Sequence, residues 1–532
     1  MARRGVRYYR AVPPPEGEWE QDYAAIARSG FELVVVPVPL GGQRDLAPLL
    51  RQLELAAKYG LSLVATPAPD AEAARLDAAR VRSWANAIRE AAPDLPVLVS
   101  EPCAGSPALA TFDTEGMEWG CMAGDLLPHE VADRARAFAR GRSLWIVGLS
   151  AHTTAQVRLE TWSSLVAPDA TLVYEAWRPD LHAGPNVQPG LARPDGTPSP
   201  RLAEAGRFDE LLARDPALAG ALPCPAEAVV VILREAEEFW EAAASQTGYW
   251  DALENACRAL GSRGAHVEFA PPDALAGYPV AYVPMPFAMS AATADALRRY
   301  VEAGGCLVAE AGLARFDEQG RTARETPLHG LAEVFGARAL DAPEMLTREP
   351  VPTFTGRRGP YPCCACREPL EATTGRVKAV FADGTAAVVE NAFGSGTTRL
   401  IGTHPSQGCG GKDDKRYAQV ILDSLAFAKV KQRVTTSSPD VCVRLLEGEG
   451  GVHFLCAFNT GSAAQEAKLR VSRAVGRFRQ ALHLVSGKEQ RLLNNGLRVR
   501  IEPGDGVLLR LDAGPRLPHL PRWRPGRRRR DA

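Results

Sequence analysis

The sequence predicts an α/β protein in three parts: a shortened (β/α) TIM-like barrel, a flavodoxin-like α/β domain and a small C-terminal β-sandwich. Three observations support this fold class. Short apolar runs alternate with amphipathic segments before Pro223, and the alternation resumes after it, as in successive right-handed βαβ units. From about Val441 to Asp512 the pattern becomes a period-two alternation, which indicates antiparallel strands. The chain of 532 residues also exceeds what one hydrophobic core supports.

The first part contains short runs rich in β-branched residues, bounded by Gly, Pro or Asp, as buried parallel strands are. These runs are Phe31–Val38, Leu61–Ala65, Pro96–Val99, Leu144–Val147 and Thr171–Tyr174. Helical segments lie between them: Trp19–Ala27, Leu46–Tyr59, Ala79–Ala92 and His129–Ala139. No glycine fingerprint opens a helix, so we expect no nucleotide site and no cofactor. The region falls short of the roughly 250 residues of an ordinary barrel, so we expect fewer than eight strands, most simply seven.

The second part is predicted to form an open, flavodoxin-like sheet that ends near Leu425. Its expected strands are Ala228–Leu233, Val280–Val283 and Cys306–Ala309, and its expected helices are Trp250–Leu260 and Ala292–Glu302. In the last part, Asn459-Thr460-Gly461 and Asn494-Asn495-Gly496 predict hairpin turns. We expect the barrel over 1–222, the second domain over 223–430, the sandwich over 435–513 and a basic, disordered tail over 514–532.

Charge and hydropathy exclude several classes of partner. The formal net charge of −1 provides no overall attraction to nucleic acid. No run approaches the roughly 18 apolar residues of a membrane span, and no apolar region follows the charged first residues, so we expect neither a membrane partner nor a signal peptide. The 11 cysteines, an odd number spread over all three parts, suit reduced thiols in a cytoplasmic protein.

Several segments in both α/β parts resemble glycoside hydrolase family 42, the β-galactosidases, in the same order along the chain. In the barrel they are Asp22–Gly30, Leu53–Ala68 with its Ala-Thr-Pro, Tyr174–Arg178 and Pro194–Arg201. In the second part Gly277–Pro284, Tyr300–Gly305, Phe316–Gly320, Leu331–Gly336 and Asn391–Gly396 are similar to the trimerisation domain of that family. The resemblance implies a saccharide ligand and self-association, as a homotrimer.

The chemistry of the family requires two carboxyl groups about 5 Å apart, one as nucleophile and one as acid/base, at the C-terminal ends of barrel strands. The family carries its acid/base in an Asn-Glu-Tyr motif after the fourth strand and its nucleophile in a Glu-Gln-Ser motif after the seventh. This chain departs from both motifs, because the barrel has no Asn-Glu pair and Gly148 occupies the nucleophile position in Leu144–Ser150. We therefore expect β-galactosidase activity to be absent or very weak.

Two glutamates that end predicted strands, Glu101 and Glu175, are the candidate catalytic residues. Ser100-Glu101-Pro102 resembles the acid/base motif of the wider glycosidase clan. The alternative alignment places Glu101 on a later, non-catalytic strand, and it explains the missing residues as one deleted barrel unit. Such a deletion would leave the barrel open on one side. Either glutamate also suits a strand-end carboxylate that is hydrogen-bonded inside the barrel mouth.

Three further residues are candidates for saccharide binding: Trp177, Asp125 and His182. An indole face packs well on a pyranose, although Trp177 equally suits the core. Asp125 follows a predicted strand, and His182 lies in the loop beyond Arg178, for which we expect a structural ion pair.

The cluster Cys363-Cys364-Ala365-Cys366 lacks the usual two-residue spacing of zinc ligands, so we expect no metal there. Two functions remain open for the whole chain. One is a divergent glycosidase that uses Glu101 and Glu175, and the other is a non-catalytic carbohydrate-binding or scaffold protein.

Overall fold

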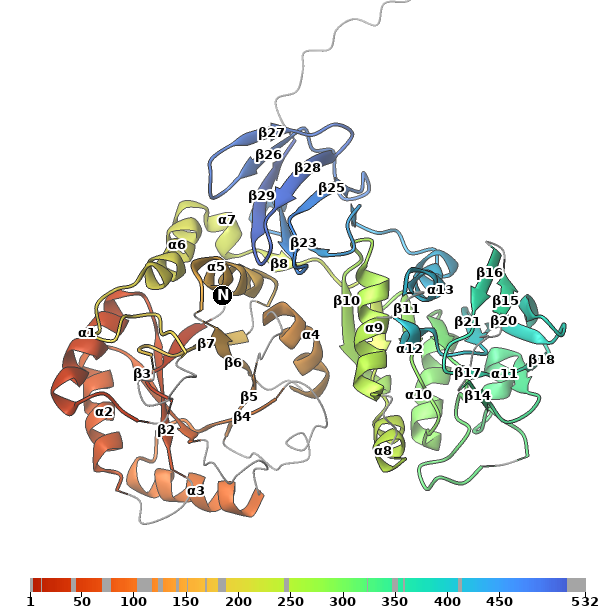
Figure 1. Cartoon of the computed structure of the whole chain (residues 1–532), viewed down its shortest axis with the longest axis horizontal. Helices are drawn as coiled ribbons and strands as arrows, with labels where there is room; N and C mark the ends of the chain where they lie inside the picture. Colours follow the sequence, from red (N-terminus) through yellow and green to blue (C-terminus); the bar gives the residue numbers. More distant parts are fainter. Residues whose placement is uncertain are drawn as a thin grey trace, which may run out of the picture.

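The computed structural model describes residues 3–10, 12–39, 45–68, 78–102, 117–122, 128–139, 143–150, 152–167, 170–179, 188–243, 248–322, 324–346, 353–356, 359–409 and 414–513. Figure 1 shows three parts: a ring of strands and helices, a second α/β unit, and a β-rich unit that contacts both. None of the helices in these ranges is long and apolar enough to cross a membrane.

The first part is a ring of parallel strands. In chain order they are β1 (Arg3–Arg7), β2 (Leu33–Val38), β3 (Ser62–Pro67), β4 (Leu98–Pro102), β5 (Glu118–Met122), β6 (Leu144–Ser150) and β7 (Ala170–Glu175). The hydrogen-bonded order is β3-β2-β1-β7-β6-β5-β4. A bridge between Ala65 and Val97 joins the two ends of this order, and the Ala65 amide donates to the Pro96 carbonyl at 3.0 Å. The structure thus confirms a shortened barrel, but the bridge closes the side that we expected to be open.

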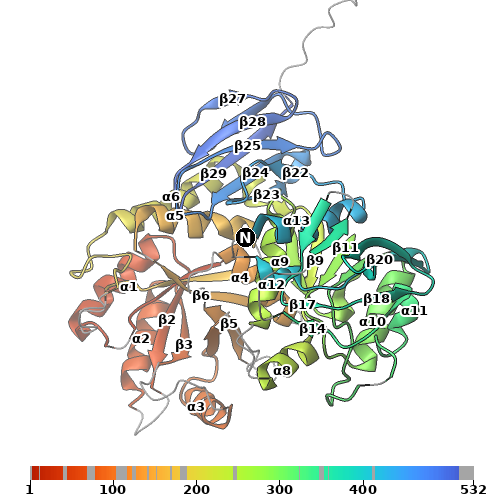
Figure 2. The same cartoon turned by 45° about the vertical axis from the view of Figure 1, so that its right-hand side comes forward.

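Helices cover the outside of the ring (Figures 1 and 2). They are α1 (Trp19–Arg28), α2 (Ala47–Lys58), α3 (Ala78–Ala91), α4 (Pro128–Ala139), α5 (Thr154–Ser163), α6 (Pro200–Arg214) and the short α7 (Pro216–Ala219). A large outer core separates strands from helices. A smaller inner cluster fills the barrel with Leu33, Val35, Val64, Leu98, Trp145, Val147 and Val173. The barrel is therefore a packed core.

The second part contains a doubly wound sheet, as predicted. Its parallel strands are β9 (Ala228–Val231), β10 (Val267–Ala270), β11 (Val280–Val283), β12 (Cys306–Ala309) and β21 (Gly396–Ile401). They are ordered β10-β9-β11-β12-β21, which is the flavodoxin-like order. The sheet continues through β20 (Ala386–Phe393), β19 (Arg376–Phe381), β15 (Thr353–Gly356) and β16 (Gly359–Pro362), which are antiparallel. Short strands β13 (Ala337–Ala339), β14 (Glu344–Met345), β17 (Cys366–Arg367) and β18 (Leu370–Ala372) lie beside it.

Six helices accompany this sheet: α8 (Arg234–Ala242), α9 (Tyr249–Gly261), α10 (Ala291–Glu302), α11 (Leu331–Phe335), α12 (Pro405–Gly408) and α13 (Asp414–Phe427). The amphipathic pattern of α10 is typical of them, because Leu297 and Val301 are buried four residues apart. Ser290 caps this helix by accepting a hydrogen bond from the Thr293 amide at 3.2 Å. The adjacent strands β11 and β12 are buried along their whole length.

The last part consists of two antiparallel sheets. One contains β22 (Val434–Thr436), β25 (Gln465–Val471) and β28 (Gly496–Ile501). The other contains β23 (Val441–Glu447), β24 (His453–Asn459), β26 (Gln480–His483), β27 (Glu489–Arg491), β29 (Gly506–Asp512) and β8 (Leu222–Pro223). Asn494 and Asn495 have φ values of 53° and 60°, as both central residues of a type I′ hairpin turn require. Because β8 comes from the segment that links the first two parts, the chain ties all three together.

Candidate active site at the barrel mouth

Glu175 lies at the C-terminal end of β7, directly opposite Arg7 at the end of β1. The Arg7 Nη1 donates to Glu175 Oε1 at 2.8 Å, and the Arg10 Nε lies 3.3 Å from the same oxygen. The Arg10 Nη2 also donates to the Glu175 carbonyl at 3.0 Å. The Glu175 side chain is 18% exposed, so it is held firmly but reachable from the mouth. Two guanidinium groups thus fix one oxygen of a carboxylate at the strand ends, where barrel active sites lie.

Gly148 forms a bulge in β6 beside this carboxylate. The β6–β7 register shifts between Val147 and Leu149, and Gly148 has a φ of 79°, which favours glycine. A Cβ atom built on Gly148 would lie 3.9 Å from Glu175 Oε2. Among the described residues, this Oε2 accepts no hydrogen bond. The Glu175 carboxylate on β7 therefore lies beside Gly148, the position that the family resemblance assigns to the nucleophile.

The structure places the other predicted site residues only in part. The backbone of Glu101 lies in β4, where it pairs with Cys121 of β5, but its side chain is outside the described atoms. Asp125 and His182 lie outside the described residues altogether. The geometry of the site therefore rests on Glu175 and its neighbours, and the roles of Glu101, Asp125 and His182 stay predictions.

Trp177 requires a correction, because it offers no face to a saccharide. Its side chain has 0% exposure and belongs to the outer core, and its indole N–H donates to Asp22 Oδ1 at 3.0 Å. Trp177 lies two residues beyond Glu175 and would share its strand face if the strand continued, but β7 ends at Glu175. The next segment turns outward, and Trp177 takes the core position that was the alternative interpretation.

The same outward turn explains Arg178, which forms the structural ion pair that we expected. The Arg178 Nη2 lies 2.8 Å from Asp22 Oδ1, and Nη1 pairs with Glu18. Asp22 is fully buried and also accepts a hydrogen bond from the Tyr8 hydroxyl at 2.8 Å. Burial, reinforced by the charge of Asp22, raises the pKa of Tyr8 far above its usual range, so this hydroxyl stays a donor. The network joins α1 to the ends of β1 and β7.

The cysteine cluster of the second part lies apart from the barrel mouth. Burial raises the pKa of both Cys363 and Cys364 to about 12, which keeps these thiols protonated. The nearby His404 is fully buried, and burial lowers its pKa to about 4. Cys306 is a buried thiol in β12, and burial raises its pKa to about 11. In the part of the chain that the structure describes, none of these thiols belongs to a group of ligand atoms with metal spacing.

The fold is a (β/α)-barrel with an appended flavodoxin-like domain and a β-sandwich. Residues 228–425 match the family model of the β-galactosidase trimerisation domain. The chain is thus similar to the β-galactosidases of glycoside hydrolase family 42.

Curated relatives and solved structures show the same similarity. The chain is 26% identical to β-galactosidase BgaH of Haloferax lucentense over 297 residues, which are 52% of this chain and 41% of the relative. It is 30% identical to β-galactosidase BgaA of a Thermus species over 161 residues, 29% of this chain and 24% of the relative. These alignments span less than half the length of either relative. The solved β-galactosidase of Bacillus circulans sp. alkalophilus has the same fold, with a TM-score of 0.73 and 13% identity over 95% of this chain and 99% of its own.

Sequence reasoning missed the two arginines that hold Glu175. Arg7 and Arg10 lie more than 160 residues away from Glu175 in the chain, so no local spacing links them. One signal was available in the sequence. In a closed barrel the first strand lies beside the last, so residues at the end of the first strand are expected near Glu175. Sequence reasoning also missed a group of potential metal ligands on the outside of the barrel, Asp133, His266 and Glu268.

Proposed function

We propose that this chain acts on or binds a saccharide at the barrel mouth, with Glu175 as the carboxylate that faces the anomeric carbon. One observation carries the proposal: Arg7 and Arg10 hold Oε1, while Oε2 lies beside the empty side-chain position of Gly148. Similarity to β-galactosidases supports a sugar as the ligand. The two guanidinium groups suit a neutral or an acidic saccharide, because guanidinium N–H groups donate to hydroxyl and carboxylate oxygens.

In the catalytic form of this proposal, Glu175 replaces the nucleophile that Gly148 cannot supply. Its Oε2 attacks the anomeric carbon and forms a glycosyl ester as the bond to the leaving oxygen breaks. A carboxylic acid, for which we retain Glu101 as the candidate, protonates the leaving oxygen. The resulting carboxylate then takes a proton from water, which attacks the ester and releases the sugar with retained configuration. Arg7 and Arg10 keep the Glu175 carboxylate oriented through both steps.

Trapping of the covalent ester tests this mechanism. The full chain is incubated with activated 2-deoxy-2-fluoro glycosides, and the labelled peptide is identified by mass spectrometry. We expect a label on Glu175 and its loss in Glu175→Gln. Azide should restore turnover of an activated glycoside in Glu175→Ala, because the anion replaces the missing carboxylate. Glu32→Gln is the matched control, since Glu32 is exposed and directly precedes β2 at the opposite end of the barrel.

A second candidate is a non-catalytic carbohydrate-binding protein, which the glycine at position 148 and the missing barrel unit favour. Calorimetry with a saccharide panel separates the two candidates. Binding without turnover, weakened at least tenfold by Glu175→Gln and unchanged by Glu32→Gln, supports binding alone. Both forms of the proposal are contradicted if no saccharide is bound or turned over, or if Glu175→Gln leaves the binding affinity unchanged.

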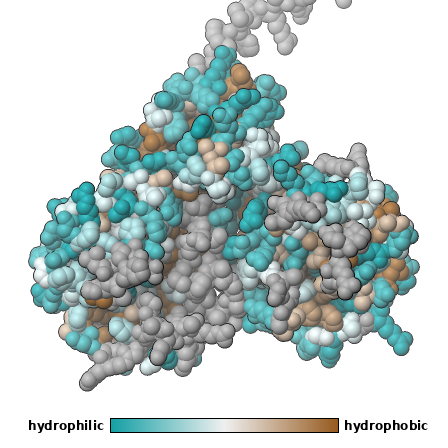
Figure 3. All heavy atoms as spheres, in the orientation of Figure 1, coloured by the Kyte–Doolittle hydropathy of each residue, from teal (hydrophilic) through white to brown (hydrophobic). Residues whose placement is uncertain are grey.

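We also propose that the chain forms a homotrimer through its second domain. The match to a trimerisation domain supports this assembly. Four large apolar side chains of this domain are at least 38% exposed, namely Leu340, Met345, Val377 and Val380. Hydrophilic residues cover much of the described surface on the face that Figure 3 shows. Light scattering should give about three times the chain mass of 57.1 kDa, and Val377→Asp should shift the mass towards one chain, whereas a wild-type monomer contradicts the assembly.

A further inference from the structure

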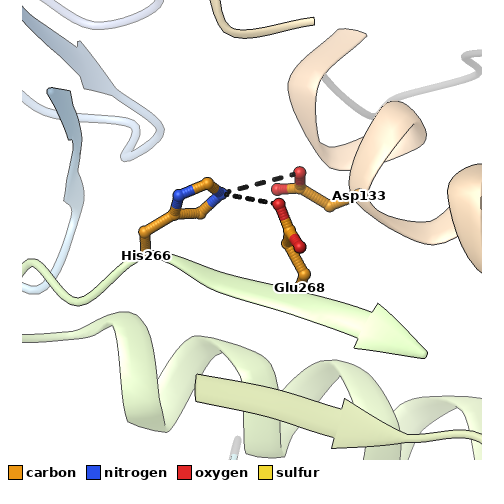
Figure 4. A group of neighbouring side chains, drawn as sticks. All are labelled: Asp133, His266 and Glu268. Carbon is orange, nitrogen blue, oxygen red and sulfur yellow. Dashed lines mark ion pairs between the residues drawn. The ribbon is translucent and has the colours of Figure 1, made fainter. Parts of the chain in front are cut away.

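We propose that Asp133, His266 and Glu268 bind a transition-metal dication of the zinc class, which joins the barrel to the second domain. Asp133 projects from α4 of the barrel, whereas His266 precedes β10 and Glu268 lies in β10, the edge strand of the second sheet. Figure 4 shows the three side chains converging on one point between the two parts. The ligand atoms of all three lie within 4.8 Å of one another.

The hydrogen bonding of His266 leaves the nitrogen that faces this point without a proton in the neutral ring. Its Nδ1 lies 3.1 Å from the carbonyl oxygen of Cys224. A carbonyl oxygen only accepts, so Nδ1 carries the hydrogen and Nε2 has the lone pair. Metal-bound histidines commonly donate their other N–H to a carbonyl in this way, which fixes the tautomer and the ring orientation.

Three acceptors therefore face one another. The Nε2 of His266 lies 3.4 Å from Glu268 Oε1 and 4.0 Å from Asp133 Oδ1. Both separations exceed the roughly 2.7–2.9 Å of a charge-assisted hydrogen bond. Ligands about 2.0–2.1 Å from a tetrahedral zinc ion are separated by about 3.4 Å along each edge. The observed spacing thus suits a cation between the three side chains.

The second atom of each ligand group has its own partner. Tyr278 donates to Glu268 Oε2 at 2.6 Å, and the Arg444 Nη2 lies 3.1 Å from Asp133 Oδ2. The backbone amide of His266 donates to Glu227 Oε2 at 3.1 Å. These contacts orient the ligands before a cation arrives, as outer-sphere partners do in metal sites. Arg444 offsets one of the two ligand carboxylates, so a dication still meets a net negative site.

Burial and access also suit a bound ion. The side chains of Asp133, His266 and Glu268 are 6%, 13% and 21% exposed, which excludes most water from the ligand atoms. Asp133 also lines a cleft of about 730 Å³, whose other walls come from α5, α9 and the sandwich. Of the three proposed ligands, Asp133 is the one that lines this cleft, together with Arg444. A nitrogen ligand with two carboxylates favours zinc-class ions over magnesium or calcium, which prefer oxygen.

The experiment measures Zn²⁺ binding to the metal-stripped full chain by calorimetry, with Co²⁺ absorption as a second readout. We expect one ion per chain with micromolar or tighter affinity, a visible Co²⁺ band, and a melting temperature several degrees higher with Zn²⁺. His266→Gln and Glu268→Gln should each weaken binding at least 100-fold and abolish the thermal shift. His152→Gln is the matched control, because this exposed histidine lies outside the cluster.

Circular dichroism of each variant shows whether it is folded. If a variant is not folded, Asp133→Asn is measured in its place. Saturable binding that the cluster variants remove and the control retains supports the site. Absence of one-to-one binding at micromolar Zn²⁺, equal affinity in the cluster variants, or loss of binding in His152→Gln overturns it. Equal affinity for Mg²⁺ would also overturn the assignment to the zinc class.

Discussion

Replacement of Asp22 by Asn should destabilise the barrel by about 3 kcal/mol. Asp22 has 0% exposure and accepts hydrogen bonds from Tyr8, Trp177 and Arg178. The asparagine is nearly isosteric and keeps one acceptor, so packing is preserved and the change is mainly the loss of charge. Hydrogen bonds to a charged group contribute about 1.5–3 kcal/mol, and neutral ones about 0.5–1.5 kcal/mol.

The structure sets the size of this effect. Asp22 Oδ1 accepts three hydrogen bonds, two from Arg178 and one from Trp177, at 2.8–3.0 Å. A loss of about 1 kcal/mol for each gives about 3 kcal/mol. This value is at the low end of the roughly 3–5 kcal/mol for breaking a buried ion pair. The low end is appropriate because Arg178 keeps Glu18 and the Pro194 carbonyl as partners.

Urea unfolding followed by tryptophan fluorescence measures the change, because six of the nine tryptophans precede residue 223. A loss of about 3 kcal/mol lowers the midpoint by about 1 M or more at usual slopes. Glu20→Gln is the control: it is the same type of substitution, on the same helix, at an exposed ion pair with Lys58. A midpoint that shifts equally in both variants, or in neither, would refute the role of the buried network.

Three further outcomes are expected. Gly148→Ala should lower the free energy of unfolding in urea by about 1 kcal/mol, because the φ of 79° disfavours a side chain. It should leave saccharide binding intact, since the added Cβ lies 3.9 Å from Glu175 Oε2. An unchanged urea midpoint would contradict the strain at this position. Burial lowers the pKa of His404 from 6.5 to about 4, so the unfolded chain takes up this proton first and stability falls as the pH drops from about 6.5 to about 4, by roughly 3 kcal/mol in total. The difference in stability between wild type and His404→Gln should therefore shrink over that range, and a constant difference would exclude the effect. Asn495→Ala should lower the free energy of unfolding by about 1–2 kcal/mol, because Asn495 adopts a φ of 60° and forms hydrogen bonds with Phe478 and Gly476. Asn494→Gly, one residue earlier in the same turn, should leave the free energy of unfolding unchanged in the same assay.

The second domain was predictable because its parallel strands are buried on both faces. Such strands appear as continuous apolar runs, and β11 and β12 begin and end where the sequence predicts. β1 gives no such signal, since it reads Arg-Arg-Gly-Val-Arg. Arg4 pairs with Asp209, and Arg7 pairs with Glu175, so the charges of this strand are balanced by residues far along the chain.

The candidate site was predictable only where a strand end marks it. Glu175 follows an apolar run and lies at the mouth, as proposed. Trp177 was misplaced because strand alternation stops at Glu175, and the sequence does not mark where a buried strand ends. Asp133 and His266 approach each other only when the barrel packs against the second sheet, and their separation of more than 130 residues matches no local ligand spacing.

The number of strands in the barrel has a consequence for its interior. Eight-stranded barrels stack their inner side chains in layers, and alternate strands fill each layer, which requires an even number of strands. In a ring of seven strands, two neighbours must fill the same layer at one junction. Val64 and Leu98 belong to the inner cluster on either side of the β3–β4 junction, where one bridge closes the ring. A seven-stranded ring therefore cannot repeat the strict alternation of an eight-stranded barrel all the way round.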